Sequence, residues 1–404
     1  MRSKLATATL LLALLPAAAP AFAADAPFTP AAAGNAFGLD LYASLRAEGE
    51  NLFFSPASIA YALAMTGLGA RGGTAAEMDR VLHLPADDEA VAAGFGALMG
   101  DVARDDGAVT VRLANRLYGQ RGTPFSPDFL ARIERHFGAA LEQVDYRRDA
   151  EGARRLINGW VEQQTAQKIR ELLGPGAVDT MTELVLVNAV YFLGKWSEPF
   201  PKRATTDAPF HRERGGDVTT QFMRTTDSFG YAEQDGAQVL SLPYRGDSME
   251  MVVILPHEGT PLTQIEKQLD AAKLAEWLAS PQPTQVEVML PRLHLETSFD
   301  LGGALRRLGM PAAFSREANF TGMTTNAAPL FISSVVHKAY LDVDEEGTEA
   351  AAATAVTLET LSMSPVLPGK PKVFRADRPF ILAIQHAESG AVLFLGRVAD
   401  PARR

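Results

Sequence analysis

The stretch 344–362, DEEGTEAAAATAVTLETLS, constrains this chain more than any other segment. It begins with three acidic residues and one glycine, continues through a run of alanine and threonine, and ends in β-branched residues. Small side chains of this kind fit a narrow gap between two strands without overpacking it. The alanines alone favour a helix, but Thr354, Val356 and Thr357 stiffen the second half toward a strand. We therefore expect a segment that can be either an exposed loop or an inserted β-strand.

The alternation of side chains in this segment suits insertion. Successive residues of a strand point to opposite faces of a sheet, so every second side chain would face the core. No charged side chain would then point inward, and no proline lies between Gly347 and Leu361. The residues expected to face the core are Thr348, Ala350, Ala352 and Thr354.

Composition limits the classes of function open to the chain. It has no cysteine, which excludes disulfides and thiol catalysis, and 47% of its 404 residues are hydrophobic, enough for a large core. The net charge is −10 and no run of lysine or arginine occurs, so neither a nucleic acid nor heparin is expected as a partner. No H-E-x-x-H or G-x-S-x-G motif is present. We therefore expect no metal, no cofactor and no catalytic residues.

The N-terminus has the form of an export leader. Two basic residues precede an apolar run at residues 10–19, and residues 21–23 match an A-x-A cleavage site. The run is too short to span a bilayer, so no membrane contact is expected. These features predict a signal peptide at residues 1–23 and a mature chain at 24–404. The protein is expected to be secreted, extracellular or periplasmic, and the alanine-rich leader and the lack of cysteine suggest a bacterial source.

The periodicity of hydrophobic residues changes along the chain. Residues 31–173 read mainly as helices, including one at about 55–68 and an amphipathic one at 153–173 with Leu156 on its apolar face. Strands dominate afterwards, and the apolar runs that flank the turn within residues 379–398 predict a buried hairpin. Helices followed by strands indicate an α+β domain with antiparallel sheets.

The stretch 344–362 resembles the hinge and reactive loop of the serpins, protease inhibitors that trap their target. Further segments resemble serpin motifs in the same order, so that about residues 30–401 are covered. These segments are 51–65, 186–196, 290–301, 318–323, 337–339, 378–380 and 394–398.

The resemblance implies one serpin domain at residues 24–404. Its fold would be α+β, with about nine helices around three mainly antiparallel β-sheets, and a reactive centre loop at about residues 345–370 would be exposed. His337 would bond near Ser55 and Asn188, where the central sheet parts. Arg292 would form an exposed ion pair with Glu345, a kind of contact that contributes only about 0–1 kcal/mol.

The family pattern also implies three groups of site residues. The hinge would comprise Glu345, Glu346, Gly347, Thr348, Glu349, Ala350, Ala351, Ala352 and Ala353. The shutter would comprise Ser55, Pro56, Asn188 and His337, and the breach Trp196 and Arg292.

The reactive bond follows from a count along the loop. With Gly347 as the fifteenth residue before the cut, the bond lies between Leu361 and Ser362. A leucine there suits a chymotrypsin-like or cathepsin-G-like protease. The alternative bond, between Met363 and Ser364, would favour an elastase-like enzyme.

The resemblance implies an inhibitor of serine endopeptidases and not an enzyme. It would act as a monomer by suicide-substrate trapping: the loop is cleaved, a covalent acyl-enzyme forms, and the cut loop inserts into the central sheet. Two alternatives stay open. One is a cross-class inhibitor of papain-like cysteine proteases, and the other is a non-inhibitory serpin that serves as a carrier or chaperone.

Overall fold

The computed structural model describes residues 28–403 except 104, 106, 326–329 and 349–369. The predicted leader at 1–23 and both candidate reactive bonds, Leu361-Ser362 and Met363-Ser364, lie outside these residues. Among the residues that are described, no helix is both long enough and apolar enough to cross a membrane.

The described part of the chain contains nine α-helices and two short 3-10 helices. Several helices start where a side chain can accept from the free backbone N–H groups of the first turn, as Ser55 does for α2 and Asp145 for α6. The helices are α1 Pro30–Leu45, α2 Pro56–Gly67, α3 Gly72–Val81, α4 Asp88–Val102, α5 Pro127–Phe137, α6 Tyr146–Gln164, α7 Leu262–Glu266, α8 Ala271–Ala279, α9 Gly302–Leu308, η1 Lys202–Ala204 and η2 Ala312–Phe314.

The described strands form two hydrogen-bonded networks, one of six strands and one of nine. The six-stranded sheet has the order β10-β11-β12-β4-β2-β3, with β10 Leu293–Asp300, β11 Ser334–Val343, β12 Gly347–Thr348, β4 Leu184–Lys195, β2 Val109–Gln120 and β3 Leu141–Val144. The nine-stranded network contains β1 Leu52–Phe54, β15 Ala391–Val398, β14 Phe380–His386, β8 Met249–Pro256, β7 Ala237–Pro243, β6 Asp217–Gln234, β9 Gln282–Pro291 and β13 Lys372–Arg375 in this order, with β5 Thr206–His211 beside β6.

The larger network is two sheets that share the long strand β6. Residues 222–231 of β6 pair with β9, whereas residues 230–234 pair with β7. The strands between β7 and β1 form one sheet, and β5, β9 and β13 form another around the first part of β6. Only β2–β3, β4–β11 and β9–β13 pair in parallel among the described strands. The expected α+β fold with three mainly antiparallel sheets is confirmed.

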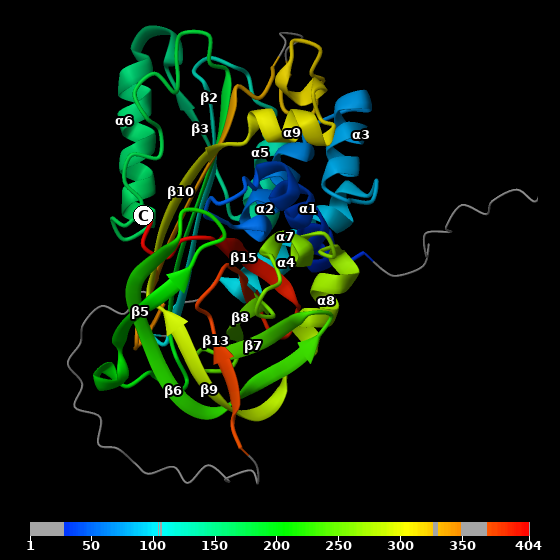
Figure 1. Ribbon diagram of the computed structural model, residues 1–404. Helices are drawn as coiled ribbons and strands as arrows, with labels where there is room; N and C mark the ends of the chain where they lie inside the picture. The colour runs from blue at the N-terminus through cyan, green and yellow to red at the C-terminus, as the bar shows by residue number, and fades with distance from the viewer. Residues whose placement is uncertain (1–27, 104, 106, 326–329, 349–369, 404) are drawn as a thin grey trace, which may run out of the picture.

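The six-stranded sheet is covered on both faces, which explains the unbroken apolar run of β4. Leu184, Leu186 and Val190 belong to the main core, which also contains the apolar residues of α2, whereas Val185 and Val187 pack in a second cluster with α6. The alternation is that of a strand with two buried faces. Figure 1 shows α6 on one side of this sheet and α1 and α2 on the other.

One helix differs from its prediction in extent and in orientation. α6 ends at Gln164, not at residue 173, and its buried residues include Ile157 and Val161, whereas Leu156 is 45% exposed. The reason is a side chain inside the helix. Asn158 accepts a hydrogen bond from the backbone of Leu173 at 2.8 Å and donates one to its carbonyl at 2.9 Å, so the chain after the helix folds back onto it.

Candidate functional site

The two central strands of the six-stranded sheet are joined along half of their length and separated beyond it. β11 and β4 pair directly and in parallel from Ser334–Val185 to Ala339–Val190. Beyond that point β12 lies between them, with Thr348 opposite Val343 on one side and Gly347 opposite Lys195 on the other. Two residues of the predicted hinge thus already occupy the gap. Residues 349–353 of the predicted hinge lie outside the described residues.

Gly347 and Thr348 fill a space that has no room for larger side chains. A β-carbon on Gly347 would lie 2.0 Å from the carbonyl oxygen of Gly194, so only glycine fits there. Thr348 is fully buried, and its hydroxyl is 2.7 Å from that of Tyr244, whose ring stacks on Trp196. Tyr244 was not predicted as a site residue; an isolated β-bridge to Trp196, just after β4, places it beside the hinge.

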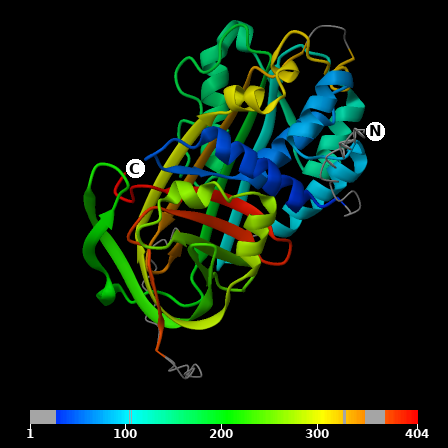
Figure 2. The ribbon, with the colours of Figure 1, turned by 45° about the vertical axis from the view of Figure 1, so that its right-hand side comes forward.

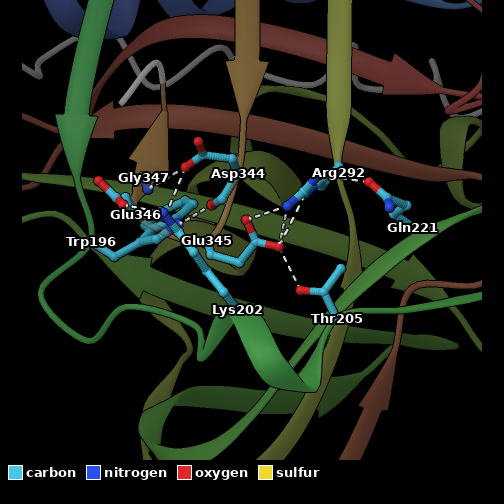
Figure 3. A network of polar contacts seen from close by, with 9 residues as sticks. All are labelled: Trp196, Lys202, Thr205, Gln221, Arg292, Asp344, Glu345, Glu346 and Gly347. Carbon is cyan, nitrogen blue, oxygen red and sulfur yellow. Dashed lines mark hydrogen bonds and ion pairs between the residues drawn. The ribbon is translucent and has the colours of Figure 1, made fainter. Parts of the chain in front are cut away.

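A tight turn at Asp344 reverses the chain between β11 and β12. The Asp344 carboxylate accepts from the backbone N–H of Glu346 at 2.8 Å and of Gly347 at 3.2 Å. Burial raises the pKa of Asp344 above its ordinary value. Trp196 closes the turn from outside, since its indole donates to the Asp344 carbonyl at 3.0 Å and its backbone N–H donates to Glu346 at 2.9 Å (Figure 3).

Arg292 and Glu345 form an ion pair, but the Arg292 side chain is 41% exposed and the Glu345 side chain only 1%, so the expectation of a fully exposed pair is wrong. Glu345 is 1% exposed and receives two hydrogen bonds of 2.7 Å from Nη2 of Arg292 and one of 2.5 Å from the hydroxyl of Thr205 (Figure 3). Burial alone would raise the pKa of Glu345, but these hydrogen bonds outweigh it and hold the pKa below its ordinary value. Hydrogen bonds to charged groups contribute about 1.5–3 kcal/mol, more than a surface ion pair.

The shutter residues form a polar row across three adjacent strands. His337 of β11 lies opposite Asn188 of β4, which lies opposite Asn115 of β2. The backbone N–H of Ser55 donates to His337 Nε2 at 3.1 Å, so Nδ1 carries the proton and donates to Asn188 Oδ1 at 2.5 Å. Burial lowers the pKa of His337 to about 3. The imidazole is therefore neutral at neutral pH.

Asn188 connects this row to the helix above it. Its amide donates to the carbonyl of Ser58 at 2.8 Å and to Oδ1 of Asn115 at 2.5 Å, and Pro56 forms the first turn of the same helix, α2. Neither Ser58 nor Asn115 was predicted. Asn115 gave no local signal, because it is half-buried, directly precedes Arg116, and lies in a strand that also contains Arg112.

The neutral His337 should make stability depend on pH. The unfolded chain takes up a proton below about pH 6.5, whereas the folded chain does not until about pH 3. The stability is therefore fully present above pH 6.5 and is lost as the pH falls toward 3, at about 1.4 kcal/mol per pH unit. We expect urea unfolding at pH 7.5, 6.5 and 5.0 to show this loss, and the variant His337→Gln to take up one proton fewer on unfolding below pH 6.5. Equal pH slopes for the two proteins would contradict this.

Comparison with known proteins identifies close relatives over almost the whole chain. The leukocyte elastase inhibitor of Bos taurus is 44% identical over 380 residues, which cover 92% of this chain and 99% of its own. The Homo sapiens protein of the same name is 42% identical over 381 residues, which cover 91% and 98%. Serpin B8 of Homo sapiens is 42% identical over 376 residues, with 91% and 98% covered.

These relatives correct the predicted location. An extracellular or periplasmic protein was expected, but 99% and 98% of the two leukocyte elastase inhibitors lie within the match. Neither relative has the length left for an export leader of the kind predicted at residues 1–23, so the predicted location is wrong. The relatives are mammalian, and they give no support to a bacterial source.

Solved structures share the fold at similar coverage. Uncleaved ovalbumin superposes with a TM-score of 0.82 at 32% identity, covering 93% of this chain and 100% of its own. Serpin48 of the insect Tenebrio molitor has a TM-score of 0.81 at 31% identity, with 92% and 98% covered. The family model described as "Serpin (serine protease inhibitor)" matches residues 32–401. The chain therefore belongs to the serpin family of serine protease inhibitors.

Proposed function

We propose that this chain inhibits serine endopeptidases of the elastase-like and chymotrypsin-like classes by suicide-substrate trapping. As a serpin it is a protease inhibitor and not an enzyme, and its partners are serine proteases. The proposal rests on β12: Gly347 and Thr348 are seated between β11 and β4, and the alanine- and threonine-rich segment follows directly. Relatives named leukocyte elastase inhibitor favour an elastase-like enzyme among the targets.

The covalent step would use the serine of the protease. Its Oγ attacks the carbonyl carbon of Leu361, and the bond to Ser362 breaks. The amino group of Ser362 leaves with the proton that the protease's own base took from the serine, and Leu361 remains as an ester. Met363-Ser364 is the alternative bond, and it suits an elastase-like pocket better. In either case this chain supplies the peptide bond that is cleaved and no catalytic group.

The present register of β12 defines where the inserted loop would go. Thr348 lies opposite Gly194 of β4, and β12 is antiparallel to both β4 and β11. Each step forward along the loop therefore moves one residue back along both neighbours. Six steps lead from Thr348 to Thr354, and on the two neighbours to Asn188 and His337. Insertion would drive Thr354 between the two shutter residues.

The chemistry of Thr354 suits that position. Residues an even number apart share a face of a strand, so Thr354 would face the same side as Thr348. A hydroxyl both donates and accepts, so it can bond Asn188 and His337 after insertion has parted them. An apolar residue there would leave a buried amide or imidazole unpaired, at about 1–3 kcal/mol for each group.

The loop is long enough to move an attached protease from one end of the six-stranded sheet to the other. The segment from Thr348 to Leu361 contains 14 residues, which supply about 46 Å of strand at ~3.3 Å each. β4 has 12 residues, or about 40 Å. A protease esterified to Leu361 would thus be carried past the far end of the sheet before water hydrolyses the ester.

A denaturing gel tests the proposed function. Mixed with an elastase or with chymotrypsin, the chain should give a band at the summed mass of inhibitor and protease. Mass spectrometry of the released peptide should place its new amino terminus at Ser362 or Ser364. The variant Thr348→Arg, which cannot enter the fully buried site beside Tyr244, should be cleaved without forming the band. Complete cleavage of the unchanged protein without a covalent band would exclude trapping, and a band with papain alone would indicate the cross-class alternative.

The register argument makes a separate prediction for Thr354. Thr354→Val keeps the shape of the side chain and removes the hydroxyl, so insertion should slow and more protease should escape by hydrolysis. We expect the number of inhibitor molecules consumed per protease to rise at least twofold. The matched control is Thr357→Val, because Thr357 would face the opposite side of the sheet, away from the shutter. An equal effect of both variants, or none for Thr354→Val, would contradict the register.

A further inference from the structure

β13 is an edge strand, and one of its two edges is not paired with any described strand. It lies at the lower end of the molecule in Figures 1 and 2, and among the described strands it pairs only with β9. Just after β13, the N–H of Ala376 donates to the Met289 carbonyl of β9 at 2.9 Å. Successive residues of an extended chain direct their N–H groups to opposite edges. The N–H groups of Val373 and Arg375 therefore point away from β9.

The outer edge of β13 has its acceptors satisfied but not its donors. The Val373 carbonyl accepts from the Gln238 side chain at 3.0 Å, and the Arg375 carbonyl accepts from Nη1 of Arg378 at 3.2 Å. No group in the described part of the chain accepts from the N–H of Val373 or of Arg375. An edge with free N–H groups can pair with a strand of another chain.

A groove runs beside this edge. Its volume is about 1180 Å³, whereas pockets for small ligands measure about 300–1,000 Å³. Val373 and Arg375 line it together with the chain from His257 to Thr263, and its lining includes the buried apolar residues Leu262 and Pro379. The Val373 side chain is 49% exposed. The size and shape of the groove suit an extended peptide better than a small molecule.

Two charged side chains of the groove are available to a ligand. Arg375 of β13 and Glu258 of the turn after β8 are both exposed, and neither forms an ion pair with another described residue. The other carboxylates and the second guanidinium of the lining already have partners within the chain; they are Glu48, Glu213, Glu233, Asp377 and Arg378. Free main-chain donors, an exposed apolar side chain and one free charge of each sign are features that an added β-strand can use.

The groove is close, along the chain, to the bonds that a protease would attack. Ser362 precedes Lys372, the first residue of β13, by ten residues, and Ser364 precedes it by eight. A chain extends by at most ~3.6 Å per residue, so either bond is within about 36 Å of β13. A small protein domain is itself about 30 Å across. A protease bound at either bond can therefore also contact the groove.

We propose that β13 is a second docking site for the target protease and pairs with an extended segment on the surface of that protease. This inference rests on the proposed function. The N–H groups of Val373 and Arg375 would donate to carbonyls of the segment, and the charges of Arg375 and Glu258 would select its side chains. Docking comes before attack on the reactive bond. It should therefore raise the association rate and leave the later choice between trapping and hydrolysis unchanged.

The variant Val373→Pro tests the role of the edge. Proline removes the outward N–H and leaves the pairing with β9, because an edge strand tolerates proline where the N–H faces away from the sheet. We expect the association rate constant with an elastase to fall at least fivefold, with the number of inhibitor molecules consumed per protease unchanged. The matched control is Val373→Thr, which keeps the N–H and the branched shape and should keep the rate within twofold.

A second variant blocks the groove without changing β13. Thr260 lies in the lining, and its side chain makes no hydrogen bond with the described residues, so Thr260→Trp should fold and fill part of the groove. It should also slow association at least fivefold. Ala131→Trp, at an exposed position on α5, is the matched control and should not. Rates within twofold of the unchanged protein for both Val373→Pro and Thr260→Trp would overturn the proposal.

Binding of an inactive protease separates this inference from the proposed function. An elastase whose catalytic serine is replaced by alanine forms no ester, so its affinity for the same variants measures docking alone. We expect Val373→Pro and Thr260→Trp to weaken this binding at least fivefold, even if the active enzyme were not trapped. Sedimentation of the inhibitor alone should show a monomer. A dimer that Val373→Pro disperses would assign the edge to a second copy of this chain and overturn the proposal.

Discussion

The pairing of β4 with β11 is the contact on which the rest of the molecule depends. These strands are neighbours in parallel over six residue pairs, and they diverge where β12 enters. The row from Asn115 through Asn188 to His337 holds them together at the middle, under the first turn of α2. The turn at Asp344 holds them apart at the end. The sheet is therefore partly open before any protease arrives.

Extending β12 would replace one parallel ladder by two antiparallel ones. Antiparallel pairs are slightly more stable per residue, and the inserted strand would gain hydrogen bonds on both sides. The small side chains of the segment would enter without overpacking a core that is already dense. What opposes this in the uncut chain is connectivity, because the loop is tied at its other end to β13. Cleavage removes that connection, and the gain in strand pairing and packing then favours insertion.

The sequence predicted a site residue where its role shows in its immediate sequence neighbours. It did not predict residues that reach the site only through the tertiary fold. The acidic turn, Gly347 and the buried imidazole of His337 are visible as local anomalies. Tyr244 and Thr205 are not, because only the tertiary fold brings them, from distant parts of the chain, to Thr348 and Glu345. The exposure of Leu156 could not be foreseen either, since it follows from the long-range contacts of Asn158.

The most direct test compares the unfolding temperatures of the intact chain and of the chain cut once in the reactive loop. If the intact fold is held in a high-energy form, the cut chain should gain a full central strand and unfold at a far higher temperature, with the residues up to Leu361 protected from proteolysis. If both forms unfold at the same temperature, the loop does not enter the sheet. Trapping by loop insertion would then be contradicted as the mechanism of this inhibitor.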